Sequence, residues 1–515
     1  MDDGTRTSRS ILTAKAAVIT VIAEQILQFY SRSVFIDTLG VEVLGLNTTA
    51  HNLLSYLNLT ESGIGAAMIM TLYAPIYKKD YVAVNDLVSL LGSFYKRIAA
   101  IVLAGSALLM CFFPMIFSKM SLPLWYAYGS FGVVLAGSLL SRLFAYRQIL
   151  FNVSQQSYLI KYRTAAITIA KVVCQIIAVK YSASGYVWWL AIELAGTSAT
   201  VGMIRKMTAR HFPYVKSSAL GFGVLKRKYS MLLTKARQLF VHSITGIVLT
   251  QTMPLIIYGI ISMEKVGVYG NYLSIINGIS QLGQIPFTSM KAGVGSLIVE
   301  GDKNKQIGVF KEIFALNFWL VAIICFGLAY LTQPFVTLWV GHEYLLPDLT
   351  LWLIILSFYL SFTRLPFDIY FQAMGMCQDV GAPVVEAVLN IGAAIVLGMK
   401  FGLDGIIAGS MTGTLLIVMV WKPYFLFRTG FHVHVRVFLR MYAKLIGLIA
   451  AVGAVCSFAM KYVTLKPDTN WFHWVLFGGM TVVPFVVLLL MALYKSESSV
   501  RHLVVRFWNR KHFIE

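Results

Sequence analysis

The feature that most restricts how this chain can fold is a set of long apolar windows without a single Asp, Glu, Lys or Arg. The windows are Ile98–Ser118, Met120–Ser141, Val266–Met290, Ile313–Val340 and Trp474–Tyr494. A helix needs about 20 such residues to cross roughly 30 Å of hydrocarbon. Over 515 residues the hydrophobic fraction is 58% and the charged fraction 13%, far from the balance of a soluble domain. The sequence therefore predicts an all-α polytopic membrane protein.

Interrupted apolar segments between these windows raise the expected number of transmembrane helices to about fourteen. Their ranges are 11–36, 43–76, 86–118, 122–146, 156–180, 183–205, 230–262, 265–298, 308–340, 347–373, 380–400, 403–427, 437–463 and 472–495. Helices are expected because each one satisfies its own backbone hydrogen bonds within lipid.

The chain has 43 Lys and Arg against 22 Asp and Glu, a formal net charge of +21. In a soluble protein this surplus would suggest a nucleic-acid partner. Here most basic residues fall on one side of the helix count, for example around 78–79, 205–210, 226–228 and 506–511. By the positive-inside rule both termini are expected in the cytoplasm. The surplus then forms a cytoplasmic rim that contacts membrane lipids, and no nucleic acid is expected.

No connection between predicted helices is longer than the one at 206–229, which leaves no room for a soluble catalytic domain. No phosphate-binding loop, HExxH or GxSxG motif occurs, and the five cysteines lack metal-ligand spacing. We expect neither an enzyme nor a bound cofactor or metal. The energy source is expected to be an ion gradient, of H+ or Na+, or the gradient of the substrate itself.

Weak self-similarity recurs at one offset of 222 residues, which predicts an internal duplication. Glu42-Val43-Leu44-Gly45 aligns with Glu264-Lys265-Val266-Gly267, and Asp80 aligns with Asp302. Ser141-Arg142-Leu143 aligns with Thr363-Arg364-Leu365. Six helices return the chain to its starting side, so the two copies would have parallel topology and enclose a cavity.

This duplication predicts two six-helix lobes followed by two further helices. The expected segments are an N-lobe at 1–206, a basic cytoplasmic linker at 207–229, a C-lobe at 230–428, two helices within 429–495 and a basic cytoplasmic tail at 496–515.

Polar residues at helical spacing mark one face of each of two predicted helices, and we expect these faces to line the cavity. One face carries His51, Ser55, Asn58 and Ser62, and the other carries Asn271, Ser274, Asn277, Gln281 and Gln284. Of these, Asn277 and Gln281 are candidates for substrate binding. Hydrogen bonding between helices is the alternative role for any one of them.

Several segments resemble those of bacterial polysaccharide-repeat flippases, which belong to the multidrug/oligosaccharidyl-lipid/polysaccharide exporter superfamily. The segments are LGVEVLGL at 39–46, LTESGIGA at 59–66, YFQAMG at 370–375, Ala382-Pro383, and EAVLNIG at 386–392. The resemblance extends over about residues 10 to 460.

This resemblance implies that the protein flips an undecaprenyl-pyrophosphate-linked oligosaccharide across the bacterial inner membrane for O-antigen, capsule or exopolysaccharide assembly. Polysaccharide polymerases and glycosyltransferases would be its partners. A multidrug exporter of the same superfamily is the first alternative. A membrane polysaccharide polymerase or ligase is the second, although the short loops disfavour it.

Charged residues inside a bilayer are costly and usually have a function. Glu24, Glu61, Lys171 and Glu193 lie within predicted helices of the first lobe, and we expect the second lobe to lack such an acidic set. A desolvated carboxylate can titrate near neutral pH, so these residues are candidates for ion coupling. Alternatively, Lys171 neutralises Glu24 or Glu193, and Glu61 helps to bend its helix.

A diphosphate needs cationic donors, and arginine suits this role. Arg142 and Arg364 occupy equivalent places in the repeat, so they could clamp one diphosphate. Their alternative role is anchoring at the cytoplasmic side, with Asp368 as the partner of Arg364. Secondary candidates for substrate binding are Arg32, Lys235, Arg237 and Lys291, of which Lys235 and Arg237 could instead be cytoplasmic flanks.

Overall fold

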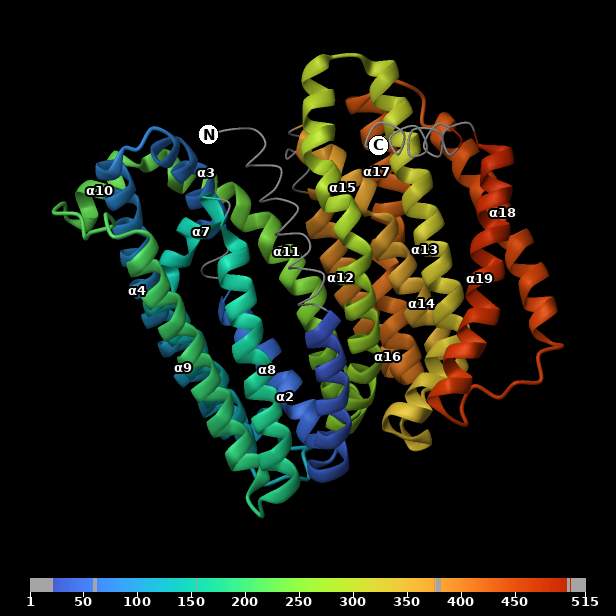
Figure 1. The fold of residues 1–515 in the computed structure, drawn as a ribbon, viewed down its shortest axis with the longest axis horizontal. Helices are drawn as coiled ribbons and strands as arrows, with labels where there is room; N and C mark the ends of the chain where they lie inside the picture. The colour runs from blue at the N-terminus through green and yellow to red at the C-terminus, as the bar shows by residue number, and fades with distance from the viewer. Residues whose placement is uncertain are drawn as a thin grey trace, which may run out of the picture. The chain divides into compact units, whose positions relative to one another are not determined.

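The computed structural model describes residues 22–58, 63–154, 156–374, 376, 381–497 and 501. Within these ranges the side chains at 66, 235, 237–239, 241–250, 288–289, 292, 296 and 299 are not described. The described residues form helices joined by turns and loops, and they contain no β-strand (Figure 1). The predicted all-α class is confirmed.

The helices of the first half begin with an unlabelled one at 22–39. It is followed by α2 (Val41–Leu57), α3 (Ile64–Tyr77), α4 (Tyr81–Cys111), α5 (Phe113–Ile116), α6 (Trp125–Phe144), η2 (Tyr146–Gln148), α7 (Ile149–Val153), α8 (Ser157–Tyr181), α9 (Gly185–His211), α10 (Phe222–Lys228) and α11 (Ser230–Ile260).

The helices of the second half include two short π-helical turns on either side of α17. They are α12 (Met263–Glu300), α13 (Lys303–Val340), η3 (His342–Tyr344), α14 (Asp348–Thr363), α15 (Leu365–Ala373), α16 (Gly381–Leu415), η4 (Leu416–Trp421), α17 (Lys422–Phe425), η5 (Leu426–Gly430), α18 (Arg436–Met460) and α19 (Trp471–Ser496).

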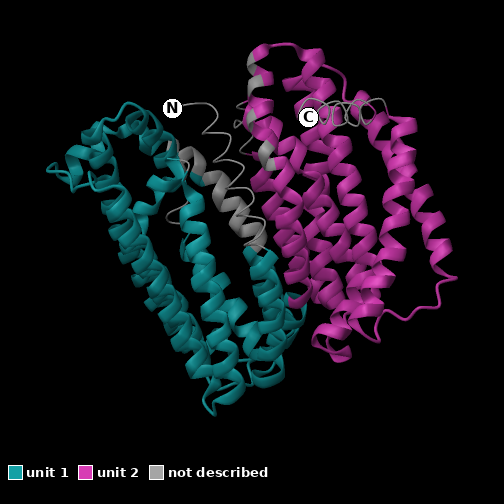
Figure 2. Cartoon of the chain, in the orientation of Figure 1, with its two compact units in different colours: residues 1–270 teal, residues 271–515 magenta. Residues whose placement is uncertain are grey.

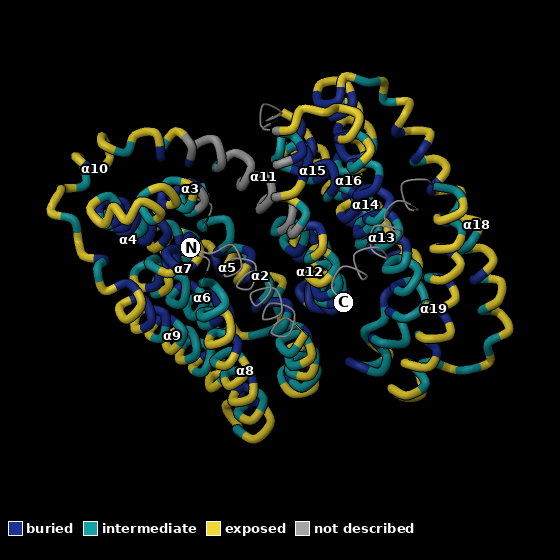
Figure 3. The backbone as a smooth tube through the Cα atoms, turned by 45° about the horizontal axis from the view of Figure 1, so that its top comes forward, coloured by how far each residue is buried: buried dark blue, intermediate teal, exposed yellow. Residues whose placement is uncertain are grey.

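Within the described residues, nine helical stretches are long and apolar enough to cross a membrane. Many of their apolar side chains stay exposed: Phe458 on α18 and Phe472 on α19 are 59% and 74% exposed. Figure 3 shows exposed residues along both helices. Apolar surface of this extent is expected to face lipid. These stretches confirm a polytopic membrane protein.

One of the nine stretches, Gly381–Gly430, covers two helices that the sequence separates at 400–403. The break is real, because Gly402 has φ +60° and ψ −136° inside α16. Residues with a Cβ atom rarely adopt a positive φ. After the break the chain turns back on itself, and Gly409 packs so closely that an added Cβ would lie 2.4 Å from the carbonyl carbon of Ala393.

The starts of the long helices repeat at the offset found in the sequence. α2 and α12 begin 222 residues apart, as do α4 and α13. Asp80 and Asp302, the aligned aspartates, are the N-caps of α4 and α13. Asp80 Oδ1 accepts a hydrogen bond from Ala83 N at 3.0 Å, and Asp302 Oδ1 accepts one from Asn304 N at 3.0 Å. These caps support the duplication, and the division into two lobes stays a prediction.

The chain forms two compact units, residues 1–270 and 271–515, coloured separately in Figure 2. The boundary falls inside α12 rather than in the predicted linker at 207–229. One reason is that α11 packs against α2 and α3, which ties it to the first unit.

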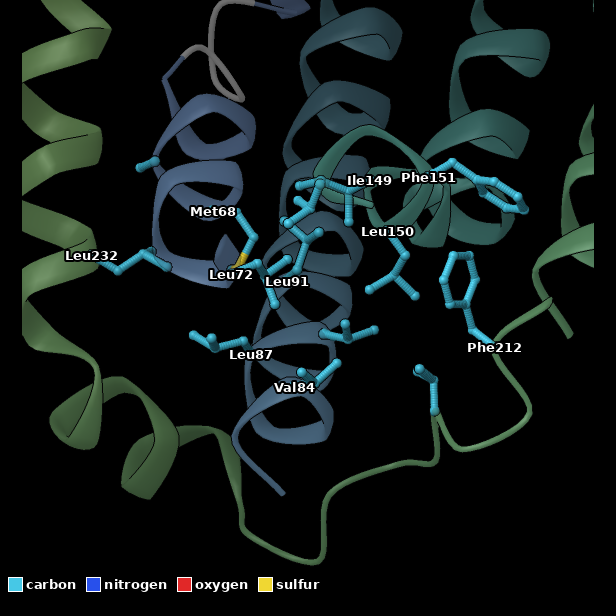
Figure 4. Packing of buried hydrophobic residues seen from close by; sticks show 14 of the residues in the cluster. Met68, Leu72, Val84, Leu87, Leu91, Ile149, Leu150, Phe151, Phe212 and Leu232 are labelled. Carbon is cyan, nitrogen blue, oxygen red and sulfur yellow. The ribbon is translucent and has the colours of Figure 1, made fainter. Parts of the chain in front are cut away.

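The core of the first unit joins α3, α4 and the short α7. Met68 and Leu72 of α3 meet Leu87 and Leu91 of α4, and all four are fully inaccessible (Figure 4). Phe151 of α7 adds an edge-on ring contact to Phe212, with centroids 4.9 Å apart. In such close packing, a change of even one methylene in these side chains is felt by the neighbouring helices.

The predicted basic linker is a strap fastened to the start of α4, which we call the 212–229 strap. The carboxylate of Asp86 on α4 accepts hydrogen bonds from Ser218 Oγ at 2.5 Å and from Lys228 Nζ at 2.6 Å. Arg97 stacks on the Phe222 ring, 3.4 Å from its centroid. The hydrogen bond to Asp86 raises the pKa of Lys228. This part of the chain is therefore held by specific contacts rather than acting as a loose connection.

Candidate functional site

In the first unit, α8 and α9 bring three polar side chains together, which we call the Lys171 cluster: Lys171, Gln175 and Glu193. Lys171 and Gln175 lie four residues apart and so share one face of α8. Lys171 Nζ lies 2.8 Å from Glu193 Oε1, and Gln175 Nε2 donates to Glu193 Oε2 at 2.9 Å. Both carboxylate oxygens are therefore engaged. The Lys171 and Glu193 side chains are 20% and 21% exposed.

A glycine on α9 makes room for this cluster. An added Cβ at Gly196 would lie 2.5 Å from Lys171 Cδ, so the lysine stem lies directly over the glycine. His51 of α2 lies within electrostatic range of both Lys171 and Glu193. Of the four charged residues predicted for ion coupling, the structure joins Lys171 and Glu193, one of the pairings that the sequence left open.

Of the other two coupling candidates, one lies on a different helix and the other is outside the described residues. Glu24 lies on helix 22–39 and is partly exposed. Glu61 is not among the described residues. Their roles stay predictions.

In the second unit, four charged side chains gather where α14, α15, α16 and α17 meet. We call them the Arg364 cluster: Arg364, Asp368, Glu386 and Lys422. Arg364 Nη2 donates to Glu386 Oε2, and Lys422 Nζ donates to Asp368 Oδ1. Glu386 is only 1% exposed. Electrostatic interactions of Lys422 extend to the other three members.

This cluster corrects two expectations from the sequence. The C-lobe does carry buried carboxylates, since Glu386 is nearly inaccessible and Glu312 on α13 is 8% exposed. Glu386 is buried because the long apolar α16 carries it against α14. Arg364 pairs with Glu386 on α16, whereas Asp368 pairs with Lys422.

Neutral groups complete the surroundings of Glu386. Thr414 Oγ1 donates to Glu386 Oε1 at 3.0 Å. Asn390, one turn after Glu386, accepts from Gly413 N at 2.7 Å and donates to Thr414 Oγ1 at 2.9 Å. These bonds tie the first half of α16 to its second half just before the π-helical turn η4.

The remaining cationic candidates are dispersed. Arg142 lies in the last turn of α6, is 6% exposed and donates to Ser138 Oγ. Arg32 Nη2 donates to Gly267 O at 3.3 Å. Lys291 is exposed on α12. The side chains of Lys235 and Arg237, on α11, are not described. Arg142 and Arg364 belong to different units, so the diphosphate clamp stays a prediction.

The polar faces differ in how far they are buried. On α12, Asn277, Gln281 and Gln284 are exposed, whereas Asn271 is fully buried. On α2, His51 is exposed and Ser55 donates to its own helix, at His51 O. Exposed amides on a membrane helix require protein or water beside them. The amides of α12 thus remain candidates for contact with a polar substrate.

Sequence reasoning missed Glu386 and Lys422 as members of a charged site, and it named Asp368 only as the partner of Arg364. One signal was present, because Lys422 follows directly on the stretch 405–421, which contains no Asp, Glu, Lys or Arg. A second signal was the Glu386 and Asn390 pair, four residues apart and hence on one helix face. Among the described residues, no group of His, Cys, Asp and Glu is suited to hold a metal ion.

Comparison with known proteins shows the fold but no close relative. No family model matches the chain, and no curated protein matches it. Among solved structures, the lipid II flippase MurJ in an inward closed conformation has a TM-score of 0.62 and 14% identity, covering 95% of this chain and 99% of that one.

Two other similar structures belong to the same broad group. An inward-facing multidrug resistance MATE family transporter of the MOP superfamily has a TM-score of 0.61 and 13% identity, covering 79% of this chain and 97% of that one. A MOP superfamily transporter from Pyrococcus furiosus has a TM-score of 0.51 and 13% identity, covering 80% and 95%. The chain thus has the fold of these transporters.

Proposed function

We propose that this protein is an alternating-access flippase. It moves an undecaprenyl-pyrophosphate-linked oligosaccharide from the cytoplasmic to the outer leaflet of a bacterial inner membrane. Both termini face the cytoplasm, and the product feeds surface polysaccharide assembly by polymerases and glycosyltransferases. An ion gradient drives the cycle.

The observation that carries this proposal is the extent of the fold likeness. The lipid II flippase covers 95% of this chain, whereas the inward-facing MATE transporter covers 79%. The flippase structure therefore aligns with more of this chain than that transporter does, at a similar TM-score. The sequence segments that resemble polysaccharide-repeat flippases point in the same direction.

The charges inside the membrane helices give separate support. Four cations lie on the long apolar helical stretches, a costly arrangement in lipid: Arg142, Lys171, Arg364 and Lys422. Arginine binds phosphate oxygens through two parallel N–H donors. A lipid-linked diphosphate would use the guanidinium groups of Arg142 and Arg364 in this way.

The test uses a bacterial strain that lacks its own polysaccharide flippase and makes the lipid-linked repeat unit. When this chain is expressed in a strain whose repeat unit it accepts, surface polysaccharide should be restored. The double variant Arg142→Glu and Arg364→Glu should abolish this restoration while the protein stays in the membrane. Gly202→Ala is the matched control, since an added Cβ there meets no atom within 4 Å.

A parallel assay addresses the multidrug exporter. The same strains are loaded with ethidium, and its efflux is followed by fluorescence. Ethidium efflux without restored polysaccharide, for any repeat unit supplied, would favour the exporter and overturn the proposed flippase.

A further inference from the structure

The segment 405–467 carries a strong surplus of positive charge. Its sequence contains no Asp or Glu, but seven Lys and Arg and two His. Two of these cations are neutralised by acids from other parts of the second unit: Lys422 pairs with Asp368, and Lys444 pairs with Glu497. Three arginines around the start of α18 have no ion-pair partner among the described residues. They are Arg428, Arg436 and Arg440. The surplus is therefore concentrated where η5 leads into α18.

A cavity of about 490 Å³ opens at this place. It is lined by Tyr424, Arg428, His432, Val433, His434 and Val435, and we call it the Arg428 pocket. No carboxylate is among these lining residues. Four of the six are exposed, so a ligand can enter from the surface. The volume is in the range of known ligand sites, roughly 300–1,000 Å³.

The loop that carries the two histidines is held in one shape by backbone hydrogen bonds. Phe431 N donates to Leu426 O at 3.0 Å, and Val433 N donates to Phe427 O at 2.9 Å. Between these two donors, His432 has φ +58°, a left-handed conformation that residues with a Cβ atom seldom adopt. Such costly backbone conformations gather at ligand sites. The pocket is thus shaped by the chain itself, before any ligand arrives.

The lining of the pocket suits a phosphate group. Arg428 donates from Nη1 to the hydroxyl oxygen of Tyr424, which leaves other guanidinium N–H groups for a ligand. Arginine binds phosphate oxygens through parallel N–H donors. An imidazole has at least one N–H donor in either protonation state, so His432 and His434 can add further bonds to phosphate oxygens.

The surroundings of the pocket favour a phosphate that belongs to a lipid. Val420 on η4 and Val437 and Leu439 on α18 are exposed on the helices that flank the pocket. Apolar surface on membrane helices faces hydrocarbon. A free phosphate ion would leave most of the cavity empty and would make no use of this apolar surface. Basic pockets at the ends of membrane helices are suited to lipid headgroups.

We propose that the Arg428 pocket binds the phosphate headgroup of an anionic membrane lipid. The acyl chains of this lipid lie along the exposed apolar side chains of η4 and α18. The lipid is a component of the bilayer and not the transported substrate, so the inference goes beyond the proposed function and does not depend on it. A lipid that binds only the folded state also stabilises the connection between η5 and α18.

The test is photo-crosslinking of the purified full-length protein in detergent, with a phosphatidate that carries a diazirine near its headgroup. Mass spectrometry of digests measures the label within 424–436, so lipid bound at other basic sites does not enter the result. Displacement of the label by unlabelled dioleoyl phosphatidate gives the affinity of the pocket. Dioleoyl phosphatidylcholine has the same acyl chains but no net charge, and it should displace the label at least about tenfold less well.

Arg428→Gln should weaken phosphatidate binding at the pocket about tenfold, as expected for a lost hydrogen bond between charged groups. Arg440→Gln is the matched control, because it removes the same charge from an exposed position on α18 that does not line the pocket. It should bind as wild type does. The double variant His432→Asn and His434→Gln should also weaken binding, and it decides the question if Arg428→Gln does not fold. Asparagine is chosen at 432 because it tolerates the left-handed conformation.

Inorganic phosphate separates the two sources of the same chemical group. At equal concentration it should not displace the label. Displacement by inorganic phosphate as effective as by phosphatidate would assign the pocket to a soluble phosphate compound and overturn the lipid. Equal displacement by phosphatidylcholine, unchanged affinity in both pocket variants, or an equal loss in Arg440→Gln would also overturn the proposal. These measurements use no lipid-linked sugar, so such results leave the flippase proposal standing.

Discussion

Lys171 Nζ lies 2.8 Å from Glu193 Oε1, and the pair joins α8 to α9 inside the first unit. Gln175 engages the second carboxylate oxygen, so Glu193 is held from two directions. In this conformation Glu193 is a structural partner of Lys171. A coupling role for Glu193 would require this pair to open during the transport cycle.

Breaking this pair from one side should destabilise the protein. Lys171→Met or Glu193→Gln leaves one charge without its partner. We expect the free energy of unfolding to fall by about 1–2 kcal/mol. The fall is smaller than for a fully buried pair, because both side chains are partly exposed. The double variant should recover most of that loss, since no charge remains. Thermal unfolding in detergent measures both effects, and additive losses in the double variant would contradict a direct pair.

Gly196 should be intolerant of even the smallest side chain. Gly196→Ala places a methyl group 2.5 Å from Lys171 Cδ, so the lysine must shift away from Glu193. We expect the melting temperature of Gly196→Ala to match that of Lys171→Met.

The matched control lies on the same helix. Gly202→Ala meets no atom within 4 Å, and it should be neutral or stabilise the protein by up to about 1 kcal/mol, because alanine favours helix over glycine. Equal melting temperatures for the two glycine variants would show that the Lys171 stem does not depend on Gly196.

The close packing of α16 on itself should also depend on glycine. Gly409→Ala brings a Cβ to 2.4 Å from backbone atoms of Ala393 and Ala394, which cannot move aside as a flexible side chain can. We expect the free energy of unfolding to fall by about 1–3 kcal/mol, as in an overpacked core. Gly392→Ala, which meets nothing within 4 Å, is the control. Size-exclusion profiles and melting temperatures compare the two, and an unaffected Gly409→Ala would refute this packing.

The 212–229 strap should open when Asp86 is neutralised. Asp86→Asn weakens the bonds from Ser218 and Lys228, and trypsin should then cleave faster at Lys226, Arg227 and Lys228. Cleavage is followed by mass spectrometry of digests near pH 8. Lys78→Gln, an exposed residue outside these bonds, serves as the control. Equal cleavage rates in wild type and Asp86→Asn would mean that other contacts hold the strap.

The bond between Asp86 and Lys228 should be insensitive to pH in the neutral range. The hydrogen bond to Asp86 raises the pKa of Lys228 above its value in the unfolded chain. The bond therefore contributes its full stabilisation at any pH below the ordinary lysine pKa of about 10.4. The contribution is lost only as the pH rises through the raised value. The tryptic pattern of wild type should therefore stay the same between about pH 7 and 9. A strap that opens within this interval would contradict the assignment.

Local sequence patterns determined the helices of this protein. Runs of apolar residues long enough to cross a bilayer predicted nearly every long helix, including the break beside Gly402, because each membrane helix satisfies its own hydrogen bonds. The 222-residue offset aligned Asp80 with Asp302, and the structure makes each of them the N-cap of the helix that follows it.

Only the tertiary structure decided the partners of the charged residues. Helical spacing suggested Asp368 for Arg364, yet Arg364 reaches Glu386 on another helix and leaves Asp368 to Lys422. Lys171 likewise meets Glu193 because α8 and α9 pack side by side. Which charge meets which depends on distances between helices that are far apart along the chain. A hydropathy pattern carries no such distances, because every span is apolar enough to pack in several ways.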